Sequence, residues 1–233
     1  MKDFKFIKDC ICMHDDLGNM ILNDDCLKIL PLLDDNLVDY SFTSPPYNRK
    51  RNDKYKDFKD INNDWLNMNI KVINELLRIS KKHIFYNIQA NYYNRSEVYH
   101  LIGHFSKNIL DIHIWQKSNP MPAGGYNITN AVEYFLILGN LSLKSNTTYT
   151  KNIITTAVNS NMPKDHKAIM KPEVAKHFIS KFTKENDVIL DCFFGYGTTG
   201  IICKELNRNF IGIEMQKSYF DVSLKNLNVN LQK

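Results

Sequence analysis

Short apolar runs alternate with longer segments in which apolar residues recur every three or four positions. Runs typical of buried strands occur at 20–23, 37–43, 83–88, 109–116, 131–138, 187–191 and 209–214. Helical spacing or composition occurs at 25–33, 64–82, 96–105, 172–183, 199–206 and from about residue 217 onward. Because strands and helices alternate, the pattern predicts an α/β domain with a mostly parallel central sheet.

Two polar segments interrupt this pattern. Residues 48–64 are rich in lysine, arginine, aspartate and asparagine, and residues 139–165 are rich in asparagine, serine and threonine. Neither segment can contribute much to a core, so we expect a mobile basic surface loop at 48–64 and a second surface loop at 139–165. No linker-like composition separates two halves, and we interpret residues 1–233 as a single domain.

Composition narrows the class of protein. The chain has 233 residues, is 43% hydrophobic and carries a formal net charge of +5, which suits one globular domain and is compatible with a polyanionic partner. Its five cysteines are irregularly spaced, which favours a reducing, cytoplasmic compartment over a disulfide framework. No segment is apolar and long enough to span a membrane. Cys10, Cys12, His14 and Cys26 lack the usual spacing of zinc ligands, so we expect no metal.

A glycine-rich turn follows the strand at 187–191. Gly195, Gly197 and Gly200 form a G-x-G-x-x-G pattern between a strand and a helix, and Glu214 lies about 20 residues further on, as in dinucleotide sites. Asp191, at the end of the strand, would repel a pyrophosphate and instead suits the amino end of S-adenosylmethionine, whose ribose Glu214 can bind. A dinucleotide oxidoreductase, or a turn that only packs a helix against a strand, stays as an alternative.

A proline turn, TSPPYN at 43–48, follows the strand at 37–43. It therefore lies at the carboxyl end of a strand, where open α/β sheets bind ligands. The prolines fix the backbone so that the carbonyls of Ser44 and Pro45 can grip an amino group, and the ring of Tyr47 can stack on a planar base. A rigid turn without a binding role is the alternative.

Together the two turns resemble the β class of amino DNA methyltransferases, in which a proline motif precedes the glycine motif in a circularly permuted order. The resemblance covers roughly residues 18–228 and includes NMILNDDC at the start, NAVEYFLIL with Glu133 and Tyr134, DHKAIMKPE and NFIGIE. It implies a Rossmann-like S-adenosylmethionine-dependent methyltransferase fold. Cys192 and Tyr196 depart from the proline and serine usual in that glycine motif.

The resemblance also implies three sets of site residues. Those expected in catalysis are Ser44, Pro45, Pro46 and Tyr47. Those expected to bind the cofactor S-adenosylmethionine are Asp25, Asp191, Phe193, Phe194, Gly195, Gly197, Thr198, Thr199 and Glu214. Those expected to contact DNA phosphates are Arg49, Lys50, Arg51 and Lys54. Lys117, Asn119 and Pro122 are candidates for lining the base pocket, with a structural loop as the equal alternative.

The implied reaction is methyl transfer to the exocyclic amine of a flipped base in double-stranded DNA. The chain contains no Pro-Cys pair, which argues against methylation at carbon 5 of cytosine. Ser44 at the head of the motif favours N4 of cytosine over N6 of adenine. Methylation of RNA or of protein glutamine, and a catalytically silent nucleic-acid-binding module, remain alternatives. Residues 139–165 would form a short target-recognition insertion, so a homodimer is a further hypothesis, and a partner restriction endonuclease stays open.

Overall fold

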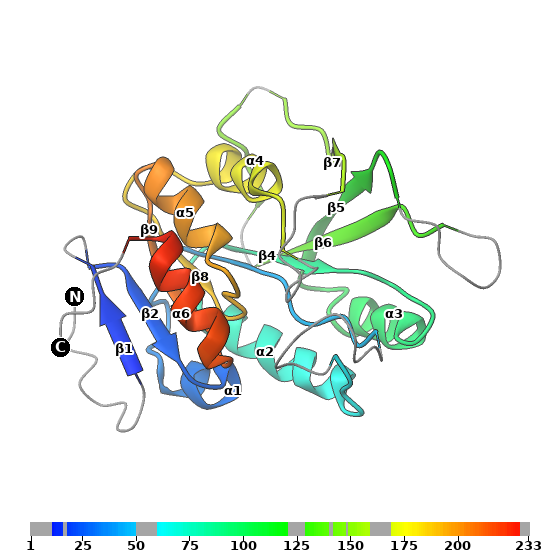
Figure 1. Cartoon of the computed structure of the whole chain (residues 1–233). Coiled ribbons are helices and arrows are strands. Elements are labelled where there is room, and N and C mark those ends of the chain that lie inside the picture. Colours follow the sequence, from blue (N-terminus) through cyan, green and yellow to red (C-terminus); the bar gives the residue numbers. More distant parts are fainter. Residues whose placement is uncertain are drawn as a thin grey trace.

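The computed structural model describes residues 11–15, 18–49, 60–120, 129–139, 142–147, 149–158 and 169–228. Within these residues, nine strands form one sheet in the order β1-β2-β9-β8-β3-β4-β6-β5-β7 (Figure 1). The strands are β1 (Ile11–His14), β2 (Met20–Asn23), β3 (Tyr40–Thr43), β4 (His83–Ile88), β5 (Ile109–Lys117), β6 (Val132–Gly139), β7 (Ile153–Thr156), β8 (Val188–Asp191) and β9 (Asn209–Ile213).

The sheet is parallel from β2 through β9, β8 and β3 to β4. β6 runs antiparallel to both β4 and β5, β1 runs antiparallel to β2, and β7 pairs in parallel with β5. The predicted α/β class with a mostly parallel sheet is therefore confirmed.

Helices cover both faces of the sheet (Figure 1). They are α1 (Cys26–Ile29), the 3-10 helix η1 (Leu30–Leu32), α2 (Trp65–Ile79), α3 (Arg95–His104), α4 (Pro172–Phe182), α5 (Thr198–Glu205) and α6 (Lys217–Asn226). Buried side chains of α1, α2 and α3 share one core, and those of α4, α5 and α6 share the other. In the described part of the chain, no helix is long and apolar enough to cross a membrane.

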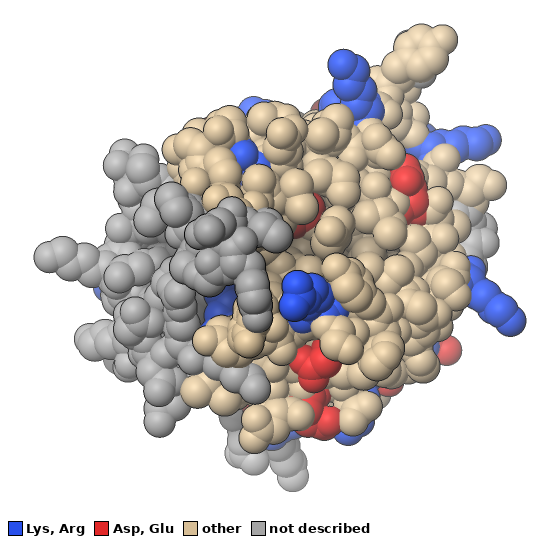
Figure 2. Space-filling view, turned by 90° about the vertical axis from the view of Figure 1, so that its right-hand side faces the viewer, with Lys and Arg blue, Asp and Glu red and all other residues tan. Residues whose placement is uncertain are grey.

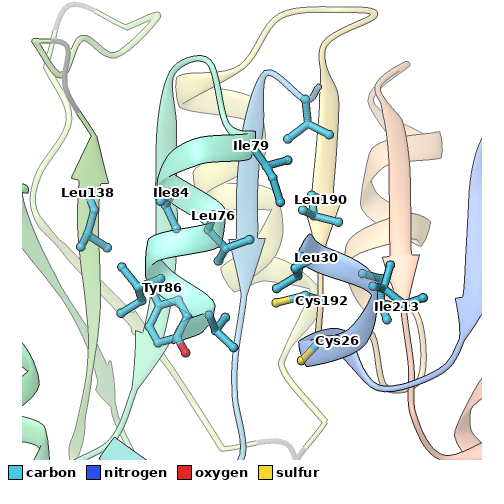
Figure 3. Packing of buried hydrophobic residues seen from close by; sticks show 14 of the residues in the cluster. Cys26, Leu30, Leu76, Ile79, Ile84, Tyr86, Leu138, Leu190, Cys192 and Ile213 are labelled. Atoms are coloured by element: carbon cyan, nitrogen blue, oxygen red, sulfur yellow. The ribbon is translucent and has the colours of Figure 1, made fainter. Parts of the chain in front are cut away.

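The alternation of side chains along β4 shows why both faces need helices. Ile84 and Tyr86 point into the core under α2, where Leu76 and Ile79 meet them (Figure 3). Phe85 points to the other face and packs at 5.3 Å, between ring centroids, against Phe178 of α4. A strand buried on both faces is apolar at successive positions, as Ile84, Phe85 and Tyr86 are in β4.

The chain changes direction across the sheet between β3 and β8. From β3 it passes through α2 to β4 on one side, and from β8 it passes through α5 to β9 on the other. Such a switch point leaves a crevice outside the carboxyl ends of the two strands, where open α/β sheets bind their ligands. The proline turn and the glycine turn are the segments that leave these two ends.

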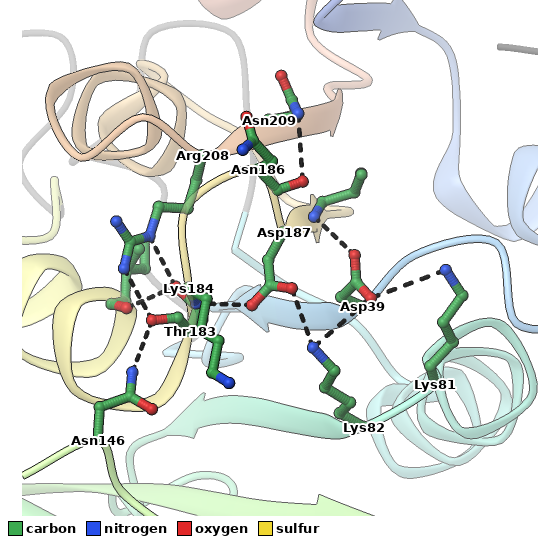
Figure 4. A network of polar contacts seen from close by, with 12 residues as sticks. Asp39, Lys81, Lys82, Asn146, Thr183, Lys184, Asn186, Asp187, Arg208 and Asn209 are labelled. Atoms are coloured by element: carbon green, nitrogen blue, oxygen red, sulfur yellow. Dashed lines mark hydrogen bonds and ion pairs between the residues drawn. The ribbon is translucent and has the colours of Figure 1, made fainter.

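A polar network holds the opposite ends of the same strands (Figure 4). Lys82, which precedes β4, contacts Asp187 at 2.9 Å and Asp39 at 3.7 Å, and Asp39 accepts a hydrogen bond from the backbone N–H of Val188. These contacts join the segments that enter β3, β4 and β8. The relative position of the three central strands is therefore fixed at the end away from the crevice.

One expectation from the sequence was wrong and one strand was missed. The segment 139–165 was expected to be a loop, but it contains β7, which pairs with β5 at the edge of the sheet. The side chains of β7 are exposed or only partly buried, so this strand has no apolar signature. β1 was not predicted at all, and within the described residues β2 is its one neighbour in the sheet.

Candidate active site

A cavity of about 480 Å³ lies at the carboxyl ends of β3 and β8 and is lined by both turns. All four residues of the predicted catalytic set line it. The predicted cofactor-binding residues that line it are Asp25, Asp191, Phe193, Phe194, Gly195, Thr198, Thr199 and Glu214. Two segments that are almost 150 residues apart in the sequence therefore share one binding space.

The glycine turn has a backbone that only glycine adopts readily. Gly195 and Gly197 have φ values of 53° and 83°. A Cβ on Gly197 would approach Ser223 of α6 and Leu227 just after it, and this glycine is absent from the cavity wall. The structure therefore places Gly197 as a residue that shapes the turn, whereas Gly195 lines the cavity.

Asp191 joins the two turns. Its carboxylate accepts hydrogen bonds from the hydroxyl of Thr43 at 2.7 Å, the hydroxyl of Thr199 at 2.5 Å and the backbone N–H of Phe193 at 3.1 Å. Burial raises the pKa of Asp191, and these three hydrogen bonds oppose that rise. Because Thr43 ends β3, its bond to Asp191 fixes the start of the proline turn relative to the glycine turn.

Glu214 follows β9 and is 8% exposed. Its two carboxylate oxygens accept from the backbone N–H groups of Gly195, at 2.8 Å, and Gln216, at 2.7 Å. Burial nevertheless raises the pKa of Glu214 to about 7, with a smaller contribution from the charge of Asp191. A carboxylate has about four acceptor positions, so this group can accept two further hydrogen bonds from a ligand in the cavity.

The cavity wall is acidic. Among the described residues that line it, the carboxylates are Asp25, Asp60, Asp64, Asp191 and Glu214, and the single cation is Lys71 of α2. Asp25 also caps α1, because its side chain accepts a hydrogen bond from the backbone N–H of Leu27 at 2.9 Å. This balance of charge favours a ligand that carries positive charge.

The second half of the proline turn is anchored through its backbone. Trp65 donates its indole N–H to the carbonyl of Pro46 at 2.6 Å. Asn91 and Asn94 both donate to the carbonyl of Tyr47 at 2.8 Å. These anchors hold the turn in place, so Ser44 and Pro45 in its first half are presented to the cavity.

Asp60 anchors the chain beyond the turn, and sequence reasoning missed it. This residue is 2% exposed and accepts the backbone N–H groups of Asn48 at 2.7 Å and Arg49 at 3.0 Å. Asn48 and Asn62 exchange two further hydrogen bonds of 2.8 and 3.0 Å. The expected mobile loop at 48–64 is therefore clamped at both of its ends, and nothing in its composition marks Asp60 among the other polar residues.

The predicted DNA-contacting residues fall in two groups. The Arg49 guanidinium lies 5.2 Å from the ring centroid of Tyr47 and donates to Gln89 at 2.6 Å. Lys50, Arg51 and Lys54 lie outside the described residues. On the face in Figure 2, the coloured lysine and arginine side chains are scattered and form no continuous patch.

Among the described residues, the candidates for the base pocket do not line the cavity. Lys117 pairs with Glu133 behind the proline turn and does not line the cavity. Asn119 accepts the backbone N–H of Val158 at 2.6 Å, which is a structural role, and Pro122 lies outside the described residues. Cys26, Cys192 and Cys203 are free, buried thiols, and within the described ranges no three histidine, cysteine or acidic side chains cluster as a metal site.

Known proteins are similar to this chain over almost its whole length. The model of a family described as DNA methylase matches residues 38–225. Type II methyltransferase M.HinfI from Haemophilus influenzae is 28% identical over 247 residues, which cover 91% of this chain and 69% of the relative. Type II methyltransferase M.MwoI from Methanothermobacter wolfeii is 30% identical over 227 residues, but these are 87% of this chain and only 34% of the relative.

Solved structures share the fold. The cytosine-N4-specific PvuII DNA methyltransferase has a TM-score of 0.75 at 15% identity, covering 93% of this chain and 88% of that protein. M1.HpyAVI, solved as a complex with SAM, has a TM-score of 0.60 at 24% identity, covering 89% of this chain and 98% of that protein. The arrangement of strands and helices therefore has close counterparts over about nine-tenths of the chain.

Proposed function

The chain belongs to the DNA methylase family, and from that premise we propose that it transfers a methyl group from S-adenosylmethionine to the exocyclic amino group of a base in DNA. The predicted methyltransferase fold is confirmed by the structural likeness. One observation carries the proposal: the proline turn and the glycine turn line a single cavity and are joined by the hydrogen bond between Thr43 and Asp191.

The cavity fits S-adenosylmethionine in its charges and hydrogen-bonding groups. Glu214 has acceptor positions for ribose hydroxyls, and Asp191 retains one for an ammonium group. The acidic wall suits a sulfonium, and Lys71 supplies a cation for a carboxylate. When bound, S-adenosylmethionine supplies the electrophilic methyl group.

The proline turn would hold the amine that receives the methyl group. We assign the acceptors to the Ser44 hydroxyl oxygen and to the carbonyls of Ser44 and Pro45, which would bind the amino hydrogens and draw the nitrogen lone pair out of conjugation. The ring of Tyr47 would stack on the base, which must first leave the duplex. Rate acceleration would then come from positioning and from placed dipoles, without a covalent intermediate on the protein.

We propose N4 of cytosine as the preferred target, with N6 of adenine as the alternative. The support is Ser44 at the head of the Pro-Pro-Tyr sequence, since the aspartate or asparagine typical of the adenine enzymes is absent there. The Ser44 hydroxyl is a neutral acceptor, and both amines need acceptors of this kind, so the serine favours cytosine without excluding adenine.

We propose double-stranded DNA as the macromolecular partner, gripped by Arg49 together with Lys50, Arg51 and Lys54. Residues 139–165 are the proposed target-recognition insertion. Because this insertion is short, a second copy of the chain would extend the grip on DNA. A cognate restriction endonuclease is proposed only by analogy with the Type II relatives.

The test incubates the purified protein with unmethylated DNA and S-adenosylmethionine and identifies the modified nucleosides by mass spectrometry after digestion. N4-methylcytosine supports the full proposal, N6-methyladenine replaces its choice of base, and no modified nucleoside refutes it. Ser44→Ala is expected to lose most activity, whereas Ser180→Ala, an exposed serine of α4, is a matched control that keeps it. Full activity of Ser44→Ala would remove the proline turn from the mechanism.

A further inference from the structure

A buried network of side chains lies behind the proline turn and reaches away from the cavity. Glu133, at the start of β6, pairs with Lys117, at the end of β5, at 2.5 Å. The other oxygen of Glu133 accepts the hydroxyl of Tyr47 at 2.8 Å. Asn87, at the end of β4, accepts from the hydroxyl of Ser44 at 3.0 Å and from that of Tyr47.

The ion pair is almost completely enclosed. The side chains of Lys117 and Glu133 are 13% and 5% exposed. Burying two charges is costly, and replacing a buried ion pair by apolar residues of similar volume is often neutral or stabilising. A buried ion pair at this position therefore calls for an explanation other than stability.

The network fixes the direction of its own hydrogen bonds. The Asn87 amide donates its N–H to the carbonyl of Tyr134 at 3.3 Å, so its oxygen faces the two hydroxyls. The Glu133 carboxylate, which pairs with Lys117, can only accept. Tyr47 has a single hydroxyl proton, and both of these neighbours are acceptors, so that proton points toward Glu133 or Asn87 and away from Ser44.

The consequence for Ser44 follows from counting protons. The Ser44 and Tyr47 hydroxyl oxygens lie 2.9 Å apart, and Tyr47 has no second proton to donate. Ser44 must therefore donate its own proton into the network, to Tyr47 or to Asn87. Its remaining lone pairs are then free for a donor in the cavity, which Ser44 lines.

We propose that Lys117 and Glu133 are positioning residues that keep the Ser44 hydroxyl oriented as an acceptor for the amino group of the substrate, acting through Tyr47. This inference rests on the proposed function and deepens it, because it assigns a role to a charge that never touches the substrate. The pair also comes from the two ends of the β5–β6 connection, where Lys117 donates its backbone N–H to Ala131 at 2.7 Å.

The test is a double-variant cycle with Glu133→Gln and Tyr47→Phe. A glutamine can donate to Tyr47 and so reverse the chain of hydrogen bonds, and a phenylalanine keeps the ring but breaks the chain. We expect each single variant to lower kcat roughly 10- to 100-fold, the scale seen when a reacting group is misplaced. The KM for S-adenosylmethionine should stay within about threefold, because the cofactor side of the cavity is untouched.

The double variant is the decisive protein. If Glu133 acts through Tyr47, replacing Glu133 lowers kcat no further once the Tyr47 hydroxyl is absent. The kcat of the double variant then equals that of the less active single variant. Losses that multiply independently, or a KM that rises while kcat is kept, would overturn the inference. Glu205→Gln breaks an exposed ion pair with Lys176 and is the control for removing a carboxylate, with wild-type kcat expected.

Two further measurements keep the outcomes separate. If Glu133→Gln does not fold, Lys117→Gln replaces it and Lys117→Arg serves as the conservative variant, expected to restore most of kcat; equal activity of the two would overturn the inference. The wild-type protein is assayed first with the same DNA. A wild type without methyl transfer refutes the proposed function and the inference with it, whereas an active wild type with independent losses refutes the inference alone.

Discussion

The raised pKa of Glu214 predicts that cofactor binding depends on pH. In the folded protein without ligand this carboxyl group loses its proton near pH 7, compared with 4.5 for an ordinary glutamate. Ribose hydroxyls donate hydrogen bonds most strongly to the ionised form. We therefore expect affinity to fall as the pH drops below 7, because binding must then expel a proton, and to be constant above about pH 8.

The size of the effect follows from the ionised fraction. With a pKa of about 7, about one group in ten is ionised at pH 6 and about one in a hundred at pH 5. If the complex contains only the carboxylate, the dissociation constant rises about 10-fold at pH 6 and about 100-fold at pH 5. The second figure corresponds to about 2.7 kcal/mol.

Isothermal titration calorimetry with methylthioadenosine measures this without interference from the other end of the cavity. This ligand keeps the adenine and the ribose but lacks the amino-acid group that is expected near Asp191. At pH 6, titrations in two buffers of different ionisation enthalpy should show close to one proton released for each ligand bound. Glu214→Gln cannot ionise and should bind weakly, with no dependence on pH between 5 and 8.

Equal wild-type affinity at pH 5.5 and pH 8 would refute the role assigned to Glu214. A wild-type pH dependence in Glu214→Gln would refute it too, since another group would then carry that dependence. Asp25, which also lines the cavity, is the matched comparison: Asp25→Asn should leave the slope in place whatever it does to affinity.

Two predictions concern stability. Burial, with the nearby charges of Lys181 and His113, lowers the pKa of His177 to about 4 from 6.5, so its neutral ring contributes stability that is complete above pH 6.5 and is lost as the pH falls toward 4. Between pH 8 and pH 5, the free energy of unfolding measured in urea should fall by about 2 kcal/mol more for wild type than for His177→Gln. Equal decreases in the two proteins would contradict this prediction. Gly212→Ala places a Cβ 2.6 Å from a phenylalanine ring and should cost about 1–3 kcal/mol. A Cβ at Gly103 of α3 meets nothing within 4 Å, so Gly103→Ala should raise the free energy of unfolding by about 1 kcal/mol. Thermal melts in which Gly212→Ala is more stable than Gly103→Ala would contradict both predictions.

The central strands and helices were predictable because each has its own hydrophobic pattern within a short stretch of sequence. β2 and β4 have the bounds that their apolar runs predicted, and α2 lies within the predicted 64–82. β7 was not predictable in this way, because an edge strand pairs on one side and needs no apolar face. Its four residues, Ile153–Thr156, lie in a polar segment and are exposed or only partly buried.

The two turns that line the cavity were predictable from the sequence. Both turns could be recognised because prolines and glycines restrict or free the backbone locally, and because Asp191 ends β8 and Glu214 follows β9. The residues that hold the proline turn in place, such as Asp60 and Asn87, were not predictable, because they acquire their hydrogen-bond partners only in the folded chain. Lys117 shows the limit most clearly: it was a candidate for the base pocket, but it points into the wall, toward Glu133.

The pairing of β3 with β8 also has a consequence for synthesis of the protein. Thr43 and Asp191 are 148 residues apart, so β3 leaves the ribosome long before its neighbour exists. At about 5–20 residues per second, the wait lasts about 7–30 s. β4 is made meanwhile and can cover one edge of β3, but the other edge keeps unpaired backbone groups that can recruit a strand from another chain. We therefore expect aggregation to threaten the nascent chain far more than the finished protein, because the arrival of β8 closes that edge and completes the cavity in the same step.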